Sequence, residues 1–487
     1  MATPVLTPGF AVLSDCELNT GWSAYTADTE VFKQGLTAGS GTLRTAGLNT
    51  RTHTTTTFNA TGQHLRMWLN YASLGFLQTK ANGGIRLFAQ DTGGAIGYWY
   101  LGGIDTYDGG WVLLQVDMDR AFDSGSANRT IINRTGFTLN LTGAPRNAVN
   151  TWWDYLVRGN GMTITGGTSG DPITWDGIAA VDAANGYGAV RKVNGVFFVN
   201  TNLTFGGASS TVLDDTNQII VFEDQPVDAD LYKIEALGTA DTQFKLTNSV
   251  IKSASASTRF DLLLDNAQLN TLEFTGNTVV NADATRFKSG QSVTGSVFQG
   301  CNQIQTGGAS FTDNIVRNSL DANGALLWPD GTSTQNCTFT DNNRAIQINT
   351  TGTKDFIGIT FSGNTTDINN TSGSAVTVNV SGGGTASGVT STGSAVTVQA
   401  SATLTLTGVV DGSEVRIYAH NTTTELYGLE SKAAGVDPAY SYTSPQAVDI
   451  VVHNVDYNYF RINNFSLAAA DATLPVSQVF DRNYRNP

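Results

Sequence analysis

The chain has 487 residues, of which 27 are basic and 41 acidic, giving a net charge of −14. A charged fraction of 14% beside 40% hydrophobic residues excludes a disordered composition, which combines low hydrophobicity with high charge. Binding to nucleic acid or to an anionic membrane surface needs clustered Lys and Arg, and the sequence has no such cluster. The length predicts about two to four domains.

The ends of the chain and its cysteines carry little chemistry. Residues 1–15 contain neither a basic n-region nor an apolar h-region, so the sequence predicts no signal peptide. No apolar run approaches the roughly 18 residues of a membrane-spanning helix, so we expect no membrane insertion. Cys16, Cys301 and Cys337 are odd in number and far apart, which indicates neither a disulfide framework nor a metal motif. We expect Cys301 and Cys337 to be small packing residues.

The first region, residues 1–165, predicts an aromatic β-sandwich domain. Short alternating runs such as 85–88 and 112–116 are typical of strands, and windows with helical spacing are almost absent, so we expect no helices. This region holds six of the eight tryptophans: Trp22, Trp68, Trp99, Trp111, Trp152 and Trp153. The Gly-rich stretch 166–172, closed by a proline, predicts the boundary.

The second region, residues 166–407, is rich in Thr, Asn and Gly and carries a degenerate repeat. An apolar residue, a small polar one, a turn residue and often Asn recur at 246–248, 274–277, 298–301, 311–314, 339–342 and 361–364. The anchors lie 28, 24, 13, 28 and 22 residues apart, and the spacing of 13 predicts a different face of the coil or an irregular rung. Such periods in an all-β context indicate a solenoid, here a right-handed parallel β-helix, whose stacked coils bury a continuous apolar column.

The repeat predicts three structural roles. Phe274, Phe339 and Phe361 are expected to stack inside the helix. The third motif position is always Gly, Asn or Asp, which tolerate positive φ, so it is expected to be a turn. The fourth position predicts one asparagine ladder, formed by Asn277, Asn314, Asn342 and Asn364. A second repeat, 374–378, recurs 20 residues later as 394–398.

The third region, residues 408–487, regains aromatic residues and predicts a small C-terminal β domain. Its aromatics include Tyr457, Tyr459, Phe460, Phe465 and Tyr484.

Paired carboxylates are the first candidates for chemistry, since glycoside hydrolysis needs two acids about 5 to 9.5 Å apart. Asp313 and Asp341 hold equivalent motif positions, but Gly fills the same position in three coils, which favours a turn role. Asp261 and Asp265 share a strand face about 13 Å apart, too far for catalysis. One coil later we expect Ser289 and Val293 beside them, so no further acid.

The other candidates also have simpler structural interpretations. The adjacent pairs Asp214–Asp215 and Glu223–Asp224 would point to opposite faces of a strand or be solvated in a loop. The acids Asp105, Asp108, Asp117 and Asp119 would suit calcium, although solvated loop acids are equally typical of strand ends. None of the histidines, His53, His64, His420 and His453, has zinc-site spacing. We therefore assign no catalytic, cofactor-binding or metal-binding residue.

At this point the chain resembles a tailed-bacteriophage virion structural protein of the tailspike, tail-fibre or head-decoration kind. Residues 10–22, 28–31 and 110–112 are similar to the concanavalin/laminin-G-like jelly rolls of phage structural proteins, and 448–452 with 457–487 resembles their small C-terminal β modules. The resemblance implies a homotrimer that contacts other virion proteins and is located in the virion. Glycan-cleaving tailspikes carry clear acid pairs on long β-helices, and this chain departs from that pattern.

Three functions stay open on this basis. The first is a non-enzymatic structural or adhesive virion component that contacts host surface glycan, with Trp152, Trp153 and Tyr107 stacking on sugar rings unless a core buries them. The alternative is a tailspike depolymerase that cleaves host surface polysaccharide. A cellular surface adhesin is the third, and it would need a secretion signal or a C-terminal sorting motif.

Overall fold

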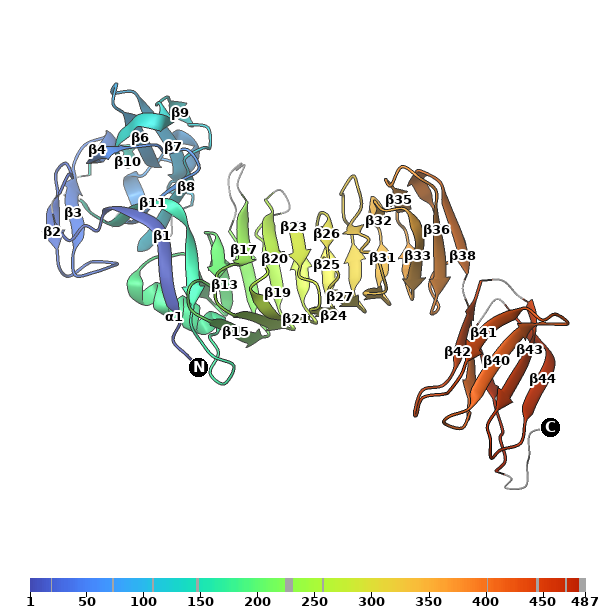
Figure 1. Cartoon of the computed structure of the whole chain (residues 1–487). Coiled ribbons are helices and arrows are strands. Elements are labelled where there is room, and N and C mark those ends of the chain that lie inside the picture. Colours follow the sequence, from blue (N-terminus) through green and yellow to red (C-terminus); the bar gives the residue numbers. More distant parts are fainter. Residues whose placement is uncertain are drawn as a thin grey trace. The chain divides into compact units, whose positions relative to one another are not determined.

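The computed structural model describes residues 1–18, 20–71, 74–106, 109–145, 149–223, 231–255, 258–400, 402–443, 446–468 and 471–480 (Figure 1). Strands hold 54% of the residues and helices 4%, which confirms the all-β prediction. The chain divides into two compact units, Met1–Gln291 and Ser292–Pro487, which we take separately.

The first unit begins with two sheets of antiparallel strands, which we call the two-sheet region. Its strands are β1 (Val5–Ser14), β2 (Thr26–Asp28), β3 (Ala38–Leu43), β4 (Gly47–Phe58), β5 (His64–Tyr71), β6 (Ile85–Asp91), β7 (Ile96–Gly102), β8 (Trp111–Asp117), β9 (Ser124–Gly125), β10 (Ile132–Leu141) and β11 (Val149–Thr165). One sheet has the order β4-β10-β6-β7-β9. In the other, β11 pairs with β1, β3 and β5, and β5 pairs with β8. Three 3-10 turns lie between strands: η1 (Leu74–Phe76), η2 (Lys80–Asn82) and η3 (Arg129–Ile131).

A single hydrophobic cluster joins the two sheets. It contains Leu87 and Phe137 from the first sheet and Met67 and Trp153 from the second. The Phe137 and Trp153 ring centroids are 5.4 Å apart. Because side chains alternate along a strand, every second residue of β6 enters this core and the others face away from it.

β11 continues from the two-sheet region into a stack of parallel strands. Its residues Met162 to Ile164 pair in parallel with β14 (Leu203–Phe205). Two side chains of β5 also cross this junction: the buried Arg66 donates to the Asn200 carbonyl, and Trp68 Nε1 donates to the Gly186 carbonyl at 2.8 Å.

The expectation of no helices is wrong, because α1 (Trp175–Asn185) follows β11. Thr174 caps its N-terminus by accepting a hydrogen bond from the Gly177 N–H, and Gly186 ends it in the left-handed conformation with φ 65°. Trp175 is fully buried, with its ring 5.8 Å from that of Phe197. α1 thus covers apolar residues of the first parallel strands, as terminal capping elements of stacked repeats do.

From β14 onward the chain visits three parallel sheets in turn. In the first unit the β14 sheet has the order β11-β14-β17-β20-β23, the β16 sheet β12-β13-β16-β19-β22 with β12 antiparallel, and the β15 sheet β15-β18-β21. The bounds are β12 (Val190–Val193), β13 (Val196–Val199), β15 (Thr211–Thr216), β16 (Ile219–Phe222), β17 (Tyr232–Ala236), β18 (Thr242–Thr247), β19 (Val250–Ser253), β20 (Phe260–Leu264), β21 (Leu269–Thr275), β22 (Thr278–Val280) and β23 (Ala282–Phe287).

The second unit begins with three parallel sheets of the same kind. Their orders are β26-β29-β32-β35-β37, β24-β27-β30-β33-β36-β38 and β25-β28-β31-β34. The bounds are β24 (Ser292–Thr294), β25 (Val297–Gln299), β26 (Ile304–Gln305), β27 (Ser310–Thr312), β28 (Ile315–Arg317), β29 (Leu326–Leu327), β30 (Thr334–Gln335), β31 (Thr338–Thr340), β32 (Arg344–Ile348), β33 (Gly352–Ile357), β34 (Thr360–Ser362), β35 (Thr366–Asn370), β36 (Val376–Ser381), β37 (Ser391–Gly393) and β38 (Val396–Ala400).

The sequence repeat marks two different turns, not one. Leu246, Phe274 and Phe311 lie on β18, β21 and β27, whereas Phe298, Phe339 and Phe361 lie on β25, β31 and β34. This explains the 13-residue spacing, because Phe298 and Phe311 belong to different sheets. Of the three rings expected to stack, Phe339 and Phe361 are register partners with centroids 5.9 Å apart, and Phe274 is in another sheet.

The turn prediction itself is confirmed at every copy of the motif. The third position has a positive φ in each copy: Asn248, Gly276, Gly300, Asp313, Asp341 and Gly363.

The single asparagine ladder is wrong for the same reason as the single stack of rings. Asn342 accepts from the Ser319 N–H at 2.9 Å, and Asn364 accepts from the Asn342 N–H at 2.9 Å, both after strands of the β25 sheet. Asn314 belongs to the other turn, where it accepts from the Ser296 N–H. Asn277 occupies that turn in the first unit and accepts from the Ser249 N–H.

The chain ends in two further sheets, after the repeat 374–378 has paired in register with 394–398 as predicted. One sheet contains β39 (Ala402–Thr407), β42 (Ala439–Tyr442) and β45 (Ala472–Pro475), and the other β40 (Glu414–Ala419), β41 (Glu425–Leu429), β43 (Gln446–His453) and β44 (Phe460–Leu467). Both contribute to one buried cluster, for example Leu404 and Ile450. β39, which the sequence division places in the middle region, thus packs with C-terminal strands.

Candidate functional site

The outer face of the β4-β10-β6-β7-β9 sheet carries two partly exposed tyrosines, Tyr98 and Tyr100. Three rows of side chains cross it in register, and we call them together the tyrosine face. The rows are Thr50–Thr138–Arg86–Tyr100, Thr52–Gly136–Phe88–Tyr98 and Thr54–Arg134–Gln90–Ile96. Their strand neighbours Leu87, Trp99 and Phe137 enter the core, so strand alternation places these rows on the opposite side.

The residues of the middle row are buried at its centre and partly exposed at its end on β7. Phe88 is only 1% exposed, and its ring lies 6.0 Å from that of Tyr98. Gly136 has a φ of 151°, and a Cβ there would lie 2.1 Å from the Arg51 carbonyl oxygen, so glycine is required. Tyr98 is partly exposed, as is Tyr100 in the neighbouring row.

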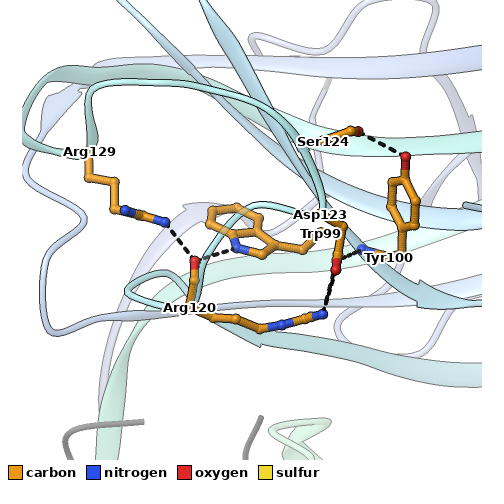
Figure 2. Close-up of polar contacts among 6 residues, drawn as sticks. All are labelled: Trp99, Tyr100, Arg120, Asp123, Ser124 and Arg129. Atoms are coloured by element: carbon orange, nitrogen blue, oxygen red, sulfur yellow. Dashed lines mark hydrogen bonds and ion pairs between the residues drawn. The ribbon is translucent and has the colours of Figure 1, made fainter. Parts of the chain in front are cut away.

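Tyr100 is held in a fixed position at both ends (Figure 2). Its hydroxyl donates to Ser124 Oγ at 2.9 Å, and its backbone N–H donates to Asp123 Oδ2 at 2.6 Å. Arg120 fixes the Asp123 carboxylate through an ion pair at 2.9 Å. The ring is therefore oriented before any ligand arrives, which lowers the entropic cost of binding.

The loop that supplies these contacts is itself anchored to the core. The Arg120 carbonyl accepts from Trp99 Nε1 at 3.0 Å and from Arg129 Nη2 at 2.6 Å (Figure 2). Phe122 packs 4.6 Å from the Trp99 ring, and a Cβ at Gly97 would lie 2.3 Å from Phe122. The loop position thus depends on the absence of a side chain at Gly97.

Two arginines flank the aromatic rings. The Arg86 guanidinium lies 4.5 Å from the Tyr100 ring centroid and 5.5 Å from that of Tyr98. Its Nε donates to the Gly83 carbonyl at 2.7 Å, so its position is also fixed. Arg134 is exposed, and within the described residues its guanidinium makes no hydrogen bond or ion pair. The face combines aromatic rings, hydroxyls, an amide and cations, which suits sugar rings and their substituents.

Of the aromatic residues considered for sugar contacts, Trp153 is fully buried in the core, which excludes such a contact. Trp152 and Trp153 both lie in β11. Trp152 Nε1 donates to Asp28 Oδ2 at 2.7 Å. Tyr107 lies outside the described residues, as does Tyr484.

Asp313 and Asp341 are not brought together as a stacked pair. Asp313 follows β27 and Asp341 follows β31, in the two different kinds of turn. Both have positive φ, 58° and 56°, so their conformation explains the residue type.

The environment of Asp261 differs from the sequence-based expectation. Leu264 pairs with Phe287, 23 residues later, so Ser289 and Val293 are not the neighbours one coil on. Instead the Ala284 N–H donates to Asp261 Oδ1 at 2.9 Å. Burial raises the pKa of Asp261, and the negative charge of Asp283 adds to this effect. Asp265 is exposed at the end of the strand.

The remaining acids serve structural roles. Asp214 pairs with Lys245 at 3.6 Å, Asp215 accepts from the Trp175 N–H at 2.8 Å, and Glu223 pairs with Arg191. Asp224 lies outside the described residues.

The proposed calcium cluster is not assembled in the described part of the chain. Asp105 accepts from the Lys80 N–H at 2.8 Å and Asp119 from the Gly62 N–H at 2.6 Å, while Asp117 is buried at the end of β8. Asp108 lies outside the described residues. Among the residues that are described, no group of three or more His, Cys, Asp or Glu is placed to hold a metal ion.

The histidines and cysteines have packing roles. His53 and His64 are buried in the two-sheet region, and His420 bonds Asp449 at 2.8 Å in the C-terminal strands, to which His453 also belongs. Cys16, Cys301 and Cys337 are buried thiols. This confirms the packing roles of Cys301 and Cys337.

Sequence analysis missed two buried acids in the first unit. Asp154 is fully buried, and burial raises its pKa to about 7 although its Oδ2 accepts the Lys33 and Gln34 N–H groups, each at 2.9 Å. Burial raises the pKa of Asp182 to about 6, against three backbone N–H donors. For Asp154 the sequence did hold a signal of burial, since this acid stands inside the apolar run of β11.

Comparison with known proteins places the chain in no family. No protein-family model and no curated protein matches the sequence. Among solved structures, the CBM22-1 xylan-binding domain of Xyn10C from Paenibacillus barcinonensis is similar at 15% identity, over 31% of this chain and 96% of that domain, with a TM-score of 0.21. A likeness at this TM-score carries no functional argument. None of the helices in the described part of the chain is long and apolar enough to cross a membrane.

Proposed function

We propose that the protein is a non-enzymatic structural and adhesive component of a bacteriophage virion, a spike, fibre or capsid decoration, that binds surface glycan through the tyrosine face. The proposal takes the two-sheet region as a concanavalin-like jelly roll and the parallel sheets as a right-handed β-helix. It is supported by the resemblance of the sequence segments to phage structural proteins and by the three successive parallel sheets.

The observation that carries glycan binding is the partly exposed pair Tyr98 and Tyr100, of which Tyr100 is held in position by hydrogen bonds. Tyrosine supplies large contact area at low entropic cost, and aromatic anchors with Arg dominate binding energies at surfaces. A carbohydrate ring presents an apolar C–H face and hydroxyls, which match the rings and the neighbouring Thr50 and Gln90.

The test is binding of the whole chain to a panel of bacterial surface polysaccharides by biolayer interferometry. Tyr100→Ala should weaken binding of a recognised polysaccharide about ten-fold, the loss of one aromatic anchor. Tyr100→Phe keeps the ring and loses only the bond to Ser124, so it should weaken binding less. Thr377→Ala on β36 is the control. Unchanged affinity for Tyr98→Ala and Tyr100→Ala would contradict the proposal.

We also propose a homotrimer, which the outer face of the β16 sheet supports. Val196, Ile219 and Val250 are register neighbours facing outward, and Ile219 is 40% exposed. The equivalent face of the β15 sheet carries the charged row of Asp214, Lys245 and Glu273. An exposed apolar stripe in register favours burial against another copy.

Sedimentation equilibrium tests the trimer. A monomer of 51.5 kDa at micromolar concentration would contradict it. Ile219→Lys should dissociate the assembly, whereas Thr247→Lys on the β15 sheet should not.

The depolymerase alternative is favoured by one observation, the raised pKa of Asp261 next to Asp283. A general acid of a glycosidase needs such a shift. Incubation with a bound polysaccharide separates the two functions: chain shortening that is abolished by Asp261→Asn would replace the adhesive role with an enzymatic one.

A further inference from the structure

We infer that the glycan recognised by the tyrosine face is a polyanion, that is, a polysaccharide with repeated carboxylate or other acidic substituents. This inference rests on the proposed glycan binding and adds the class of ligand. Its basis is the charge of the face, which is opposite to the charge of the chain as a whole.

The three rows of the tyrosine face contain two cations and no acid. Arg86 lies in the first row and Arg134 in the third, and no member of any row is Asp or Glu. The whole chain has 41 acidic against 27 basic residues. A face without carboxylates is therefore a local exception in an acidic protein, and it attracts anions while the rest of the surface repels them.

Neither guanidinium is neutralised by a carboxylate in the described part of the chain. Arg86 is only 8% exposed and donates to the backbone carbonyls of Gly83 and Asn82, which fixes its position and leaves it without a carboxylate partner. Arg134 is exposed and has no ion-pair partner among these residues. Asp123, the loop acid drawn in Figure 2, is already paired with Arg120 at 2.9 Å.

The spacing of the two cations indicates a polymer and not a small anion. Arg134 pairs with Gln90, four residues along β6 from Arg86, which corresponds to about 13 Å along the strand. The Arg86 guanidinium is held on the carbonyls of Gly83 and Asn82, which precede β6, so it does not turn toward Arg134. Tyr98, the partly exposed ring of the middle row, lies between the two arginines, so a chain stacked on Tyr98 would carry acidic groups toward Arg86 on one side and Arg134 on the other.

The decisive experiment compares polygalacturonate with its fully methyl-esterified form, two polymers that differ in the carboxylate charge alone. The full-length chain should bind polygalacturonate at least ten-fold more tightly at low ionic strength, and added salt should remove most of the difference. Arg134→Gln should weaken binding of the acidic polymer about ten-fold and leave the ester unchanged, and Arg134→Lys should retain most of the binding.

Arg461→Gln on β44 makes the same charge change away from the face and should have no effect. Thermal unfolding of each variant verifies that it is folded. Equal affinity for the two polymers, or equal effects of Arg134→Gln and Arg461→Gln, would overturn the polyanion inference and leave glycan binding intact. Binding of neutral dextran alone, sensitive to Tyr100→Ala, would overturn it as well. A chain that binds no polysaccharide in the panel would overturn both proposals.

Discussion

The two-sheet region and the parallel sheets achieve a buried core in opposite ways. In the two-sheet region the partners are distant in sequence, as where Val5 pairs with Thr165 at the ends of β1 and β11. Among the parallel strands the partner is one passage of the chain away, as where Val376 pairs with Val396. When each strand pairs with the next passage of the chain, equivalent residues recur in the sequence. Pairing between segments that are distant in the sequence leaves no such repeat.

The two arrangements differ in how far the loss of one side chain affects the core. In the parallel sheets, apolar residues such as Phe339 contact equivalent residues above and below, so each coil depends on its neighbours. In the two-sheet region a single cluster contains Trp22, Phe137 and Trp153, and each ring contacts both others. We expect local losses in the first case and loss of the whole core in the second.

Within the parallel sheets, the largest expected effect is that of removing a ring from the stack. Phe339→Ala should lower the free energy of unfolding by about 3–5 kcal/mol, the lost transfer energy plus the cavity. Phe361 is its register partner but only half-buried, so Phe361→Ala should cost roughly half as much. Urea unfolding of both variants measures the difference. Equal losses of unfolding free energy in the two variants would mean that the two rings do not differ in burial, and would contradict the assigned strand register.

The second effect is specific to the two-sheet region and depends on pH. The pKa of Asp154 is raised from 3.8 to about 7 by burial, so the folded protein holds this proton more tightly than the unfolded chain. The contribution of Asp154 to stability is therefore complete below about pH 4 and is lost as the pH rises to about 7. Three pKa units correspond to at most about 4 kcal/mol.

Thermal unfolding between pH 4 and pH 8 tests this dependence. Asp154→Asn keeps the acceptor for the Lys33 and Gln34 N–H groups and should flatten the decline in Tm with rising pH. Asp313→Asn, which removes an exposed acid from a turn of the parallel sheets, should leave the decline unchanged. A wild-type Tm that does not fall over this range would show that Asp154 is not buried as described.

Features that depend on a few adjacent residues could be predicted from the sequence, and features that depend on contacts between distant strands could not. The strand class, the turn at positions such as Gly363 and the 20-residue repeat at Val376 were predictable, because each depends on a few adjacent residues. The 13-residue spacing indicated a different face of the coil or an irregular rung, and Phe298 and Phe311 do lie in different sheets. The sequence did not show which turn each of the other copies belongs to, because two kinds of turn use the same motif. Only the strand register separates them.

The candidate site was not predictable, for a physical reason. The tyrosine face depends on Arg86, Tyr98 and Arg134 meeting across β6, β7 and β10, and β10 comes long after the β6–β7 hairpin in the sequence. No spacing motif encodes such a meeting. The helix α1 was missed although its signals were local: Thr174 before the first turn and Gly186 after the last one are typical cap residues.

The smallest expected effect concerns two neighbouring residues in one turn of the parallel sheets. Asp341→Gly should change the free energy of unfolding by less than about 0.5 kcal/mol, because the left-handed conformation at φ 56° suits glycine and Gly363 holds it one coil later. This substitution removes only the hydrogen bond that Asp341 accepts from Thr340 Oγ1 at 3.1 Å.

Asn342, the neighbour of Asp341, is the matched contrast, since it bonds the Val316 carbonyl and the Ser319 N–H in the buried ladder. Asn342→Ala leaves both backbone groups without a partner and should cost about 1–3 kcal/mol. Urea unfolding of the two variants side by side decides the matter: if Asp341→Gly were as costly as Asn342→Ala, the carboxylate of Asp341 would have a role beyond the turn.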